Sequence, residues 1–169
     1  MIPLSRPTLR LGLAAALVAS SLLAQAREAS GEASAQIRRT SFGVPHILAN
    51  DERGLGYGIG YAYAQDNLCL LANEVLTVNG ERSRYFGGDG KTVEQRDNLA
   101  SDLFFTWLNN PVAVNGFLQA QPAAVRDLLD GYARGYNRAL GERRAQGLPA
   151  EGGAGDWGRP ITSLDLVKL

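Results

Sequence analysis

The sequence has 169 residues, 45% of them hydrophobic, and its 17 basic residues balance 17 acidic residues. These values fit one globular domain, or a large part of one, and they exclude a disordered chain. The sequence has no excess of positive charge, so its composition argues against nucleic-acid binding driven by counter-ion release.

The first 26 residues have the pattern of a secretory signal peptide. Arg6 and Arg10 precede an uncharged apolar run over residues 11–24, which ends in an Ala-Gln-Ala cleavage site. The run is shorter than the roughly 20 residues that a transmembrane helix needs. We therefore predict a signal peptide at residues 1–26, a mature periplasmic chain from residue 27, and no membrane span after cleavage. A retained membrane anchor is the alternative.

The mature part begins with a predicted β-hairpin. Strands are expected at residues 37–41 and 45–49, because Gly43 can supply the positive φ of a tight turn and Pro45 disfavours helix just before it. A long helix should follow, with Asp51 as its N-cap and Asn79-Gly80 at its end. Its apolar residues recur at steps of three and four: Tyr57, Tyr61, Ala64, Leu68, Leu71, Val75 and Val78.

Glycines alternate at the start of this helix, at positions 54, 56, 58 and 60. They lack the spacing of a nucleotide-binding loop and lie within a helical pattern, so we interpret them as sites of close backbone packing. Asp66 and Asn67 are unfavourable in mid-helix, which predicts a tertiary partner. Cys69, the only cysteine, lies in an apolar stretch and is interpreted as a buried, unreactive thiol. A partner elsewhere in a longer precursor and a reactive role are the alternatives.

The second half of the sequence is predicted to be helical with polar connections. Residues 86–100 are expected to form a loop, and Ser101 to cap a short helix ending at Leu108. A further helix should begin with Pro122 in its first turn and end near residue 140, before a flexible connection over 141–159. Its apolar face comprises Val125, Leu128, Leu129, Tyr132, Tyr136, Ala139 and Leu140.

The last seven residues begin another helix, with Ser163 as the predicted N-cap and Asp165 in the first turn. No residue closes this helix before Leu169. We therefore expect the sequence to be an incomplete segment of a longer protein.

No self-contained active site emerges from the residue pattern. His46 is the only histidine, and no Gly-x-Ser-x-Gly motif could present a serine beside it. A zinc site would need His46 and Cys69 without any short ligand spacing. The acidic residues are best interpreted as caps and surface charges. Glu81–Arg84 is interpreted as a charged turn that forms ion pairs or locks the fold.

Several ordered motifs resemble the penicillin acylase family. They are Phe-Gly-Val-Pro-His-Ile at 42–47, Ala-Gln-Asp-Asn at 64–67, Gly-Glu-Arg-Ser-Arg-Tyr-Phe-Gly at 80–87 and Asp-Asn-Leu at 97–99. The likeness runs from residue 37 to 140 and resumes near Trp157. Within the family, the motifs are most similar to acyl-homoserine-lactone acylases and aculeacin-type lipopeptide acylases.

The resemblance implies an α+β fold: a mainly helical α-chain segment with an N-terminal β-hairpin, part of an αββα N-terminal-nucleophile hydrolase completed by a β chain. Such enzymes arise from an inactive precursor that cleaves itself into an αβ heterodimer. The nucleophile is then the first residue of the β chain, a serine activated by its own amino group. The resemblance therefore places no catalytic residue in residues 27–169 and requires no cofactor, although some relatives carry calcium.

The implied substrates are small acyl amides, in particular N-acyl-homoserine lactones, the signals of quorum sensing. The last helix would contribute Leu166 and Leu169 to the acyl pocket, although both also fit an ordinary core. Two alternatives stay open: a penicillin or lipopeptide acylase of the same family, and a non-catalytic exported helical module that binds a partner.

Overall fold

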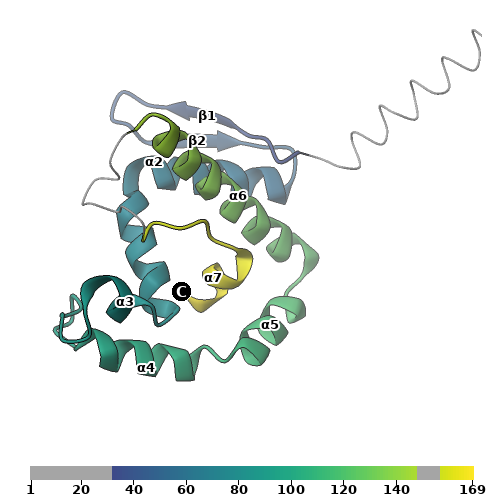
Figure 1. Ribbon diagram of the computed structural model, residues 1–169. Coiled ribbons are helices and arrows are strands. Elements are labelled where there is room, and N and C mark those ends of the chain that lie inside the picture. The colour runs from purple at the N-terminus through teal and green to yellow at the C-terminus, as the bar shows by residue number, and fades with distance from the viewer. Residues whose placement is uncertain (1–31, 148–156) are drawn as a thin grey trace, which may run out of the picture. The chain divides into compact units, whose positions relative to one another are not determined.

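The computed structural model describes residues 32–147 and 157–169. The predicted signal peptide and residues 148–156 of the predicted connection lie outside the described residues. The described elements, in chain order, are β1 Gln36–Arg39, β2 Pro45–Leu48, α2 Glu52–Val78, α3 Arg82–Phe86, α4 Asn98–Leu108, α5 Pro111–Ala120, α6 Ala123–Ala145 and α7 Ser163–Lys168 (Figure 1). The expectation of a mainly helical segment that begins with a hairpin is confirmed.

The hairpin forms where the sequence predicts it. β1 begins one residue earlier and ends two residues earlier than predicted, and β2 ends one residue earlier. β1 and β2 are antiparallel, with Ile37 opposite Ile47 and Arg38 opposite His46. Gly43 has φ +81, so the turn does use the left-handed conformation that glycine adopts without strain. One face of the hairpin lies against α2, and the other carries Arg38 and His46.

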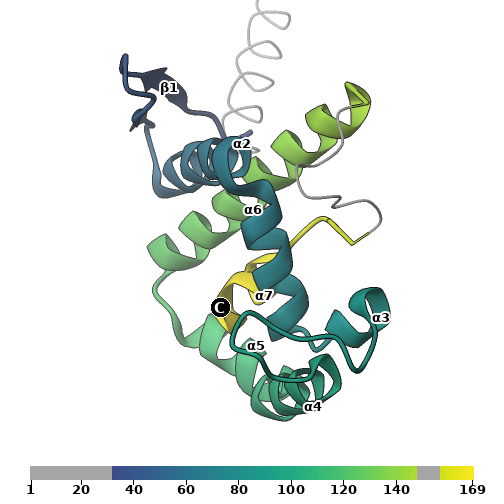
Figure 2. The same cartoon turned by 90° about the vertical axis from the view of Figure 1, so that its left-hand side faces the viewer.

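Helix α2 begins and ends as predicted. The Asp51 carboxylate accepts a hydrogen bond of 2.6 Å from the backbone N–H of Gly54, and Gly80 has φ +66 just beyond the end of the helix. The helix is kinked at Asn67, whose φ of −136 and ψ of 32 are not helical (Figure 2). A residue that competes with the backbone for hydrogen bonds favours such a break.

The predicted tertiary partner of this mid-helix stretch is Arg39 on the hairpin. Its guanidinium lies 3.0 Å from the Asp66 carboxylate and donates to the Gln65 side chain at 3.1 Å. It also donates to the Gly43 carbonyl at 2.9 Å. Arg39 therefore joins the turn of the hairpin to α2 immediately before the kink.

Three of the four alternating glycines of α2 are confirmed as sites of close backbone packing, whereas Gly58 lies against the Ile47 side chain. Gly56 and Gly60 face α6, while Gly131 and Gly135 of α6 face α2. A Cβ atom at any of the four would lie 1.9–2.1 Å from a backbone carbonyl oxygen of the opposite helix. The two helices thus approach to a distance that no larger residue permits.

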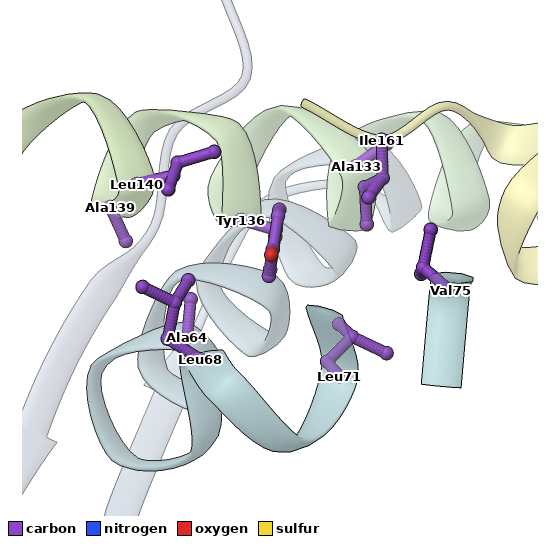
Figure 3. Packing of buried hydrophobic residues seen from close by; sticks show 9 residues of the cluster. All are labelled: Ala64, Leu68, Leu71, Val75, Ala133, Tyr136, Ala139, Leu140 and Ile161. Carbon is purple, nitrogen blue, oxygen red and sulfur yellow. The ribbon is translucent and has the colours of Figure 1, made fainter. Parts of the chain in front are cut away.

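Beyond the glycine contact, α2 and α6 enclose the core. Tyr136 of α6 is fully buried and points towards the turns of α2 that carry Ala64 and Leu68 (Figure 3). Burial raises the pKa of the Tyr136 phenol to about 12. The buried cluster comprises Ala64, Leu68, Leu71, Val75, Ala133, Tyr136, Ala139, Leu140 and Ile161. The predicted apolar faces of both helices are confirmed, except that Val125 is exposed.

Four local predictions are wrong. α4 begins at Asn98 after Asp97, and Ser101 is a buried residue inside it, not its N-cap. The charged turn at 81–84 is largely the short helix α3. Residues 111–120 form α5, although no helix was predicted there. Pro111 stands in its first turn, behind the Asn110 cap.

The fourth error concerns the connection after α6. The helix continues through Gly141 to Ala145, so the first part of the predicted flexible connection is helical. At α7 the boundary differs by one residue. Thr162 is the N-cap, and its hydroxyl and the Asp165 carboxylate form a reciprocal capping box.

Candidate functional site

Helix α7 carries the two residues predicted to contribute to substrate binding. Leu166 is half-buried and packs against the core cluster, whereas Leu169 follows the helix and is 53% exposed. The two side chains are therefore not equivalent. Leu166 has a structural role in the core, and Leu169 is the one available for a further contact. Their place in an acyl pocket stays a prediction.

Polar contacts fix α7 to the end of α2. Arg159 donates to Asp165 at 2.9 Å and to Glu81 at 3.2 Å, and Asn79 donates to Asp165 at 2.9 Å. Burial acts to raise the pKa of Asp165, but hydrogen bonds from Arg159 and Thr162 outweigh it and lower the pKa. Asp165 is thus a buried carboxylate held in its charged form, which positions the last helix.

His46 lies on the exposed face of the hairpin, beside a hollow of about 200 Å³ lined by Gln36, Arg38 and Leu48. No hydrogen bond joins its imidazole to a serine or a carboxylate among the described residues. The geometry offers no acid–base pair here.

A larger cavity, of about 550 Å³, lies beside the second half of α2. Its lining combines apolar side chains, among them Leu70, Phe86 and Trp157, with the polar Arg82 and Asn98. Phe86 and Trp157 meet edge to face with ring centroids 5.6 Å apart. Cys69, predicted to be buried, is only half-buried and also lines this cavity.

The fold-locking role expected for residues 81–84 is carried by Arg82. Its guanidinium donates to Asn98 at 2.9 Å and to Asn73 at 2.5 Å. The Asp102 carboxylate accepts the backbone N–H groups of Arg82 and Ser83 at 2.9 and 2.7 Å, which caps α3 from outside. These bonds join α2, α3 and α4.

The polar bonds give α4 an inverted amphipathic character that the sequence analysis missed. Its buried face is polar, with Asn98, Ser101 and Asp102 turned towards the rest of the chain. Its exposed face is apolar: Leu103 is 66% and Trp107 76% exposed. We define the α4–α5 apolar surface as the exposed side chains of Leu99, Leu103, Phe104, Trp107, Leu108, Val112 and Phe117. The apolar side chains at positions 99, 103 and 107 recur every four residues, and this repeat is the sequence signal that could have predicted an apolar helix face here.

Within residues 32–147 and 157–169, no three His, Cys, Asp or Glu side chains lie close enough together to hold a metal ion. No helix in those ranges combines the length and apolar character that crossing a membrane requires.

The sequence and the structure both match known acylases. Over all of its 169 residues the chain is 73% identical to "Acyl-homoserine lactone acylase PvdQ" of Pseudomonas putida, and it covers 22% of that protein. It is 38% identical to "Aculeacin-A acylase" of Actinoplanes utahensis, over 86% of this chain and 19% of that protein. The chain thus spans about a fifth of the length of these relatives.

A solved structure of a penicillin G acylase from Alcaligenes faecalis superimposes with a TM-score of 0.68 and 31% identity, covering 82% of this chain and 70% of that chain. A sequence profile described as penicillin amidase matches residues 34–167. The match extends from the start of the hairpin to α7. The chain therefore belongs to the penicillin amidase family.

Proposed function

We propose that the chain is the α-chain region of an exported N-acyl amide hydrolase that removes the acyl group from N-acyl-homoserine lactones. The observation that carries the proposal is the 73% identity across the whole chain to a protein named for that activity. In the complete enzyme, an αββα hydrolase made from a self-cleaving precursor, the nucleophile is the N-terminal serine of a β chain. The residues of this chain serve to support the site and to bind substrate.

The α4–α5 apolar surface supports a β-chain partner. Seven large apolar side chains are exposed on these two consecutive helices. Such exposure marks an interaction surface, and Trp and Phe are enriched in protein interfaces. The buried polar face of α4 makes this argument stronger, since the helix has no other way to bury its apolar residues. A further polypeptide that covers this surface would complete the amphipathic pattern.

Leu169 supports the assignment of an acyl-binding role to α7. It is apolar, exposed and held by a helix that Asp165 anchors. Each buried methylene of an acyl chain contributes about 0.8 kcal/mol of transfer free energy, so an apolar wall at this place favours long chains.

The test uses the full-length polypeptide and a long-chain N-acyl-homoserine lactone. We expect the processed protein to release free homoserine lactone, measured by mass spectrometry. Residues 27–169 alone should release none. Replacing the serine at the start of the β chain by alanine should prevent both self-cleavage and hydrolysis.

The same assay separates the alternatives when penicillin G and a lipopeptide are added as substrates. Faster release of phenylacetate or of the lipopeptide acyl group would replace the proposed substrate by one of these. A reading frame that stops after residue 169, with no hydrolysis of any amide, would favour the exported binding module.

A further inference from the structure

The 550 Å³ cavity beside α2 contains an unusual cation, Arg82, whose residue is only 7% exposed. The guanidinium donates to Asn98, Asn73 and Thr77, which are all neutral acceptors. No carboxylate of residues 32–147 or 157–169 lies within salt-bridge distance of it. Asp102, the nearest acid along this network, accepts the backbone N–H groups instead.

A buried cation without a counter-ion is unfavourable, because removal from water is not offset by an opposite charge. Within the described residues the hydrogen bonds of this guanidinium come from Nε and Nη1, so Nη2 is the nitrogen left to donate to a ligand. The carbon of the group lies 5.3 Å from the centre of the Phe86 ring, a cation–π contact. Asn98 and Asn73 hold the plane of the group fixed. A fixed, positively charged N–H donor is suited to an oxygen atom of a carboxylate.

The remaining walls of the cavity select the rest of the ligand. Phe86, Trp157 and Leu70 are apolar, and the lining includes no acidic residue. The cavity is a shallow hollow that is largely open to solvent, and its volume is in the range of about 300–1,000 Å³ that small-molecule sites occupy. The one other cation of the lining, Lys91, is already paired with Asp97, which disfavours a dianion.

We propose that this cavity binds a monocarboxylate with an alkyl or aromatic group, its carboxylate on Arg82 and its apolar part against Phe86, Trp157 and Leu70. The inference depends on the cavity alone and does not require the proposed acylase activity. An acidic side chain of the protein itself is the competing occupant of the same cation.

The experiment uses the full-length protein without any amide substrate. An octanoate derivative with a photoreactive diazirine is cross-linked to it, and labelled peptides are identified by mass spectrometry. We expect labelling of peptides that contain Leu70, Phe86 or Trp157, competition by free octanoate, and about tenfold weaker labelling with the neutral octanamide analogue. Labelling that is confined to peptides elsewhere in the protein would contradict the inference.

Two variants of α2 test the charge requirement without disturbing the Arg82 network. Leu70→Glu places a carboxylate at the cavity from an exposed position and should lower labelling of the cavity peptides about tenfold. Leu55→Glu, a matched exposed leucine on the same helix, should leave labelling unchanged. Arg82→Lys keeps the positive charge but removes the planar guanidinium group, and this variant should weaken labelling of the cavity peptides.

Three results would overturn the inference. They are equal labelling by octanoate and octanamide, no labelling of the cavity peptides at millimolar probe, and no effect of Leu70→Glu. Absence of labelling in the full-length protein would mean that its own residues occupy the cation. None of these experiments measures amide hydrolysis, so their outcome does not test the proposed function.

Discussion

Single glycines decide how closely α2 and α6 approach each other. Gly60→Ala would place a methyl group 2.1 Å from the Tyr132 carbonyl oxygen. Because neither backbone can move without displacing the other glycine contacts, we expect a loss of about 3 kcal/mol or more in the free energy of unfolding. The midpoint of urea unfolding, followed by circular dichroism, measures it.

Gly141→Ala is the matched control within α6. No atom lies within 4 Å of a Cβ at this position. Alanine is the better helix former, so this variant should be about 0.5–1 kcal/mol more stable than the parent. A similar loss in both variants would show that close packing is not the cause.

Asp165 makes the attachment of α7 depend on pH. Its pKa in the folded protein is lowered, so its contribution to stability is present above the unfolded pKa of about 3.9 and is lost as the pH falls through the lower folded value. At pH 7, Asp165→Asn should reduce the free energy of unfolding by about 1–3 kcal/mol.

The difference between parent and Asp165→Asn should then shrink as the pH is lowered below about 4. Urea unfolding at pH 7, 5, 4 and 3.5 follows this. Thr162→Val, which removes the hydroxyl of the capping box, should destabilise the protein at every pH. A difference for Asp165→Asn that stays constant over the whole range would rule out the ionised carboxylate as the source.

At the scale of elements, α4 is the helix whose large apolar side chains are exposed. Trp107→Asp and Leu103→Asp change side chains that are exposed in this chain, so its own secondary structure should be retained. If the α4–α5 apolar surface is covered in the complete enzyme, each substitution should reduce co-purification of the α and β chains by about tenfold or more.

Phe42→Asp provides the control for this experiment, because Phe42 is 94% exposed at the tip of the hairpin, away from α4. Co-purification on a tagged β chain followed by size exclusion measures association. If all three variants associate fully with the β chain, α4 is not part of the interface. Association lost only with Phe42→Asp would move the interface to the hairpin.

For the whole molecule, the prediction concerns export and processing. The apolar run of residues 11–24 and its small-residue end predict that the mature chain begins at Arg27. Mass spectrometry of the protein from the periplasmic fraction should find this N-terminus. A membrane-bound form that retains residues 1–26 would support the anchor instead.

Local patterns predicted the hairpin and the long helices with good accuracy. Gly43 and Pro45 define the turn through backbone sterics, and Asp51 and Gly80 define the ends of α2 through capping, all short-range effects. The period of apolar residues in α2 and α6 identified the two faces that pack together. The family motifs at 42–47 and 80–87 led to the penicillin amidase assignment for the same reason: they are contiguous in sequence.

Other features depended on residues far apart in the chain. Ser101 has the residue type of an N-cap, but α4 begins three residues earlier. Asn98 and Asp102 both form hydrogen bonds with Arg82, and Ser101 lies between them inside the helix. Arg39 could not be matched to Asp66 from sequence, because ion pairs carry no local signature. The cavity at Arg82 likewise has walls from α2, α3 and the segment at Trp157.

The sequence by itself therefore determined the hairpin turn, the ends of α2, the packing faces of α2 and α6, and the family, since each follows from steric and capping preferences of neighbouring residues or from contiguous motifs. Only the tertiary structure decided that α4 buries its polar face and exposes its apolar one. Hydrogen bonds with residues distant in sequence satisfy the buried side chains of Asn98 and Asp102. The apolar side chains of α4 are therefore on the opposite, exposed face of the helix.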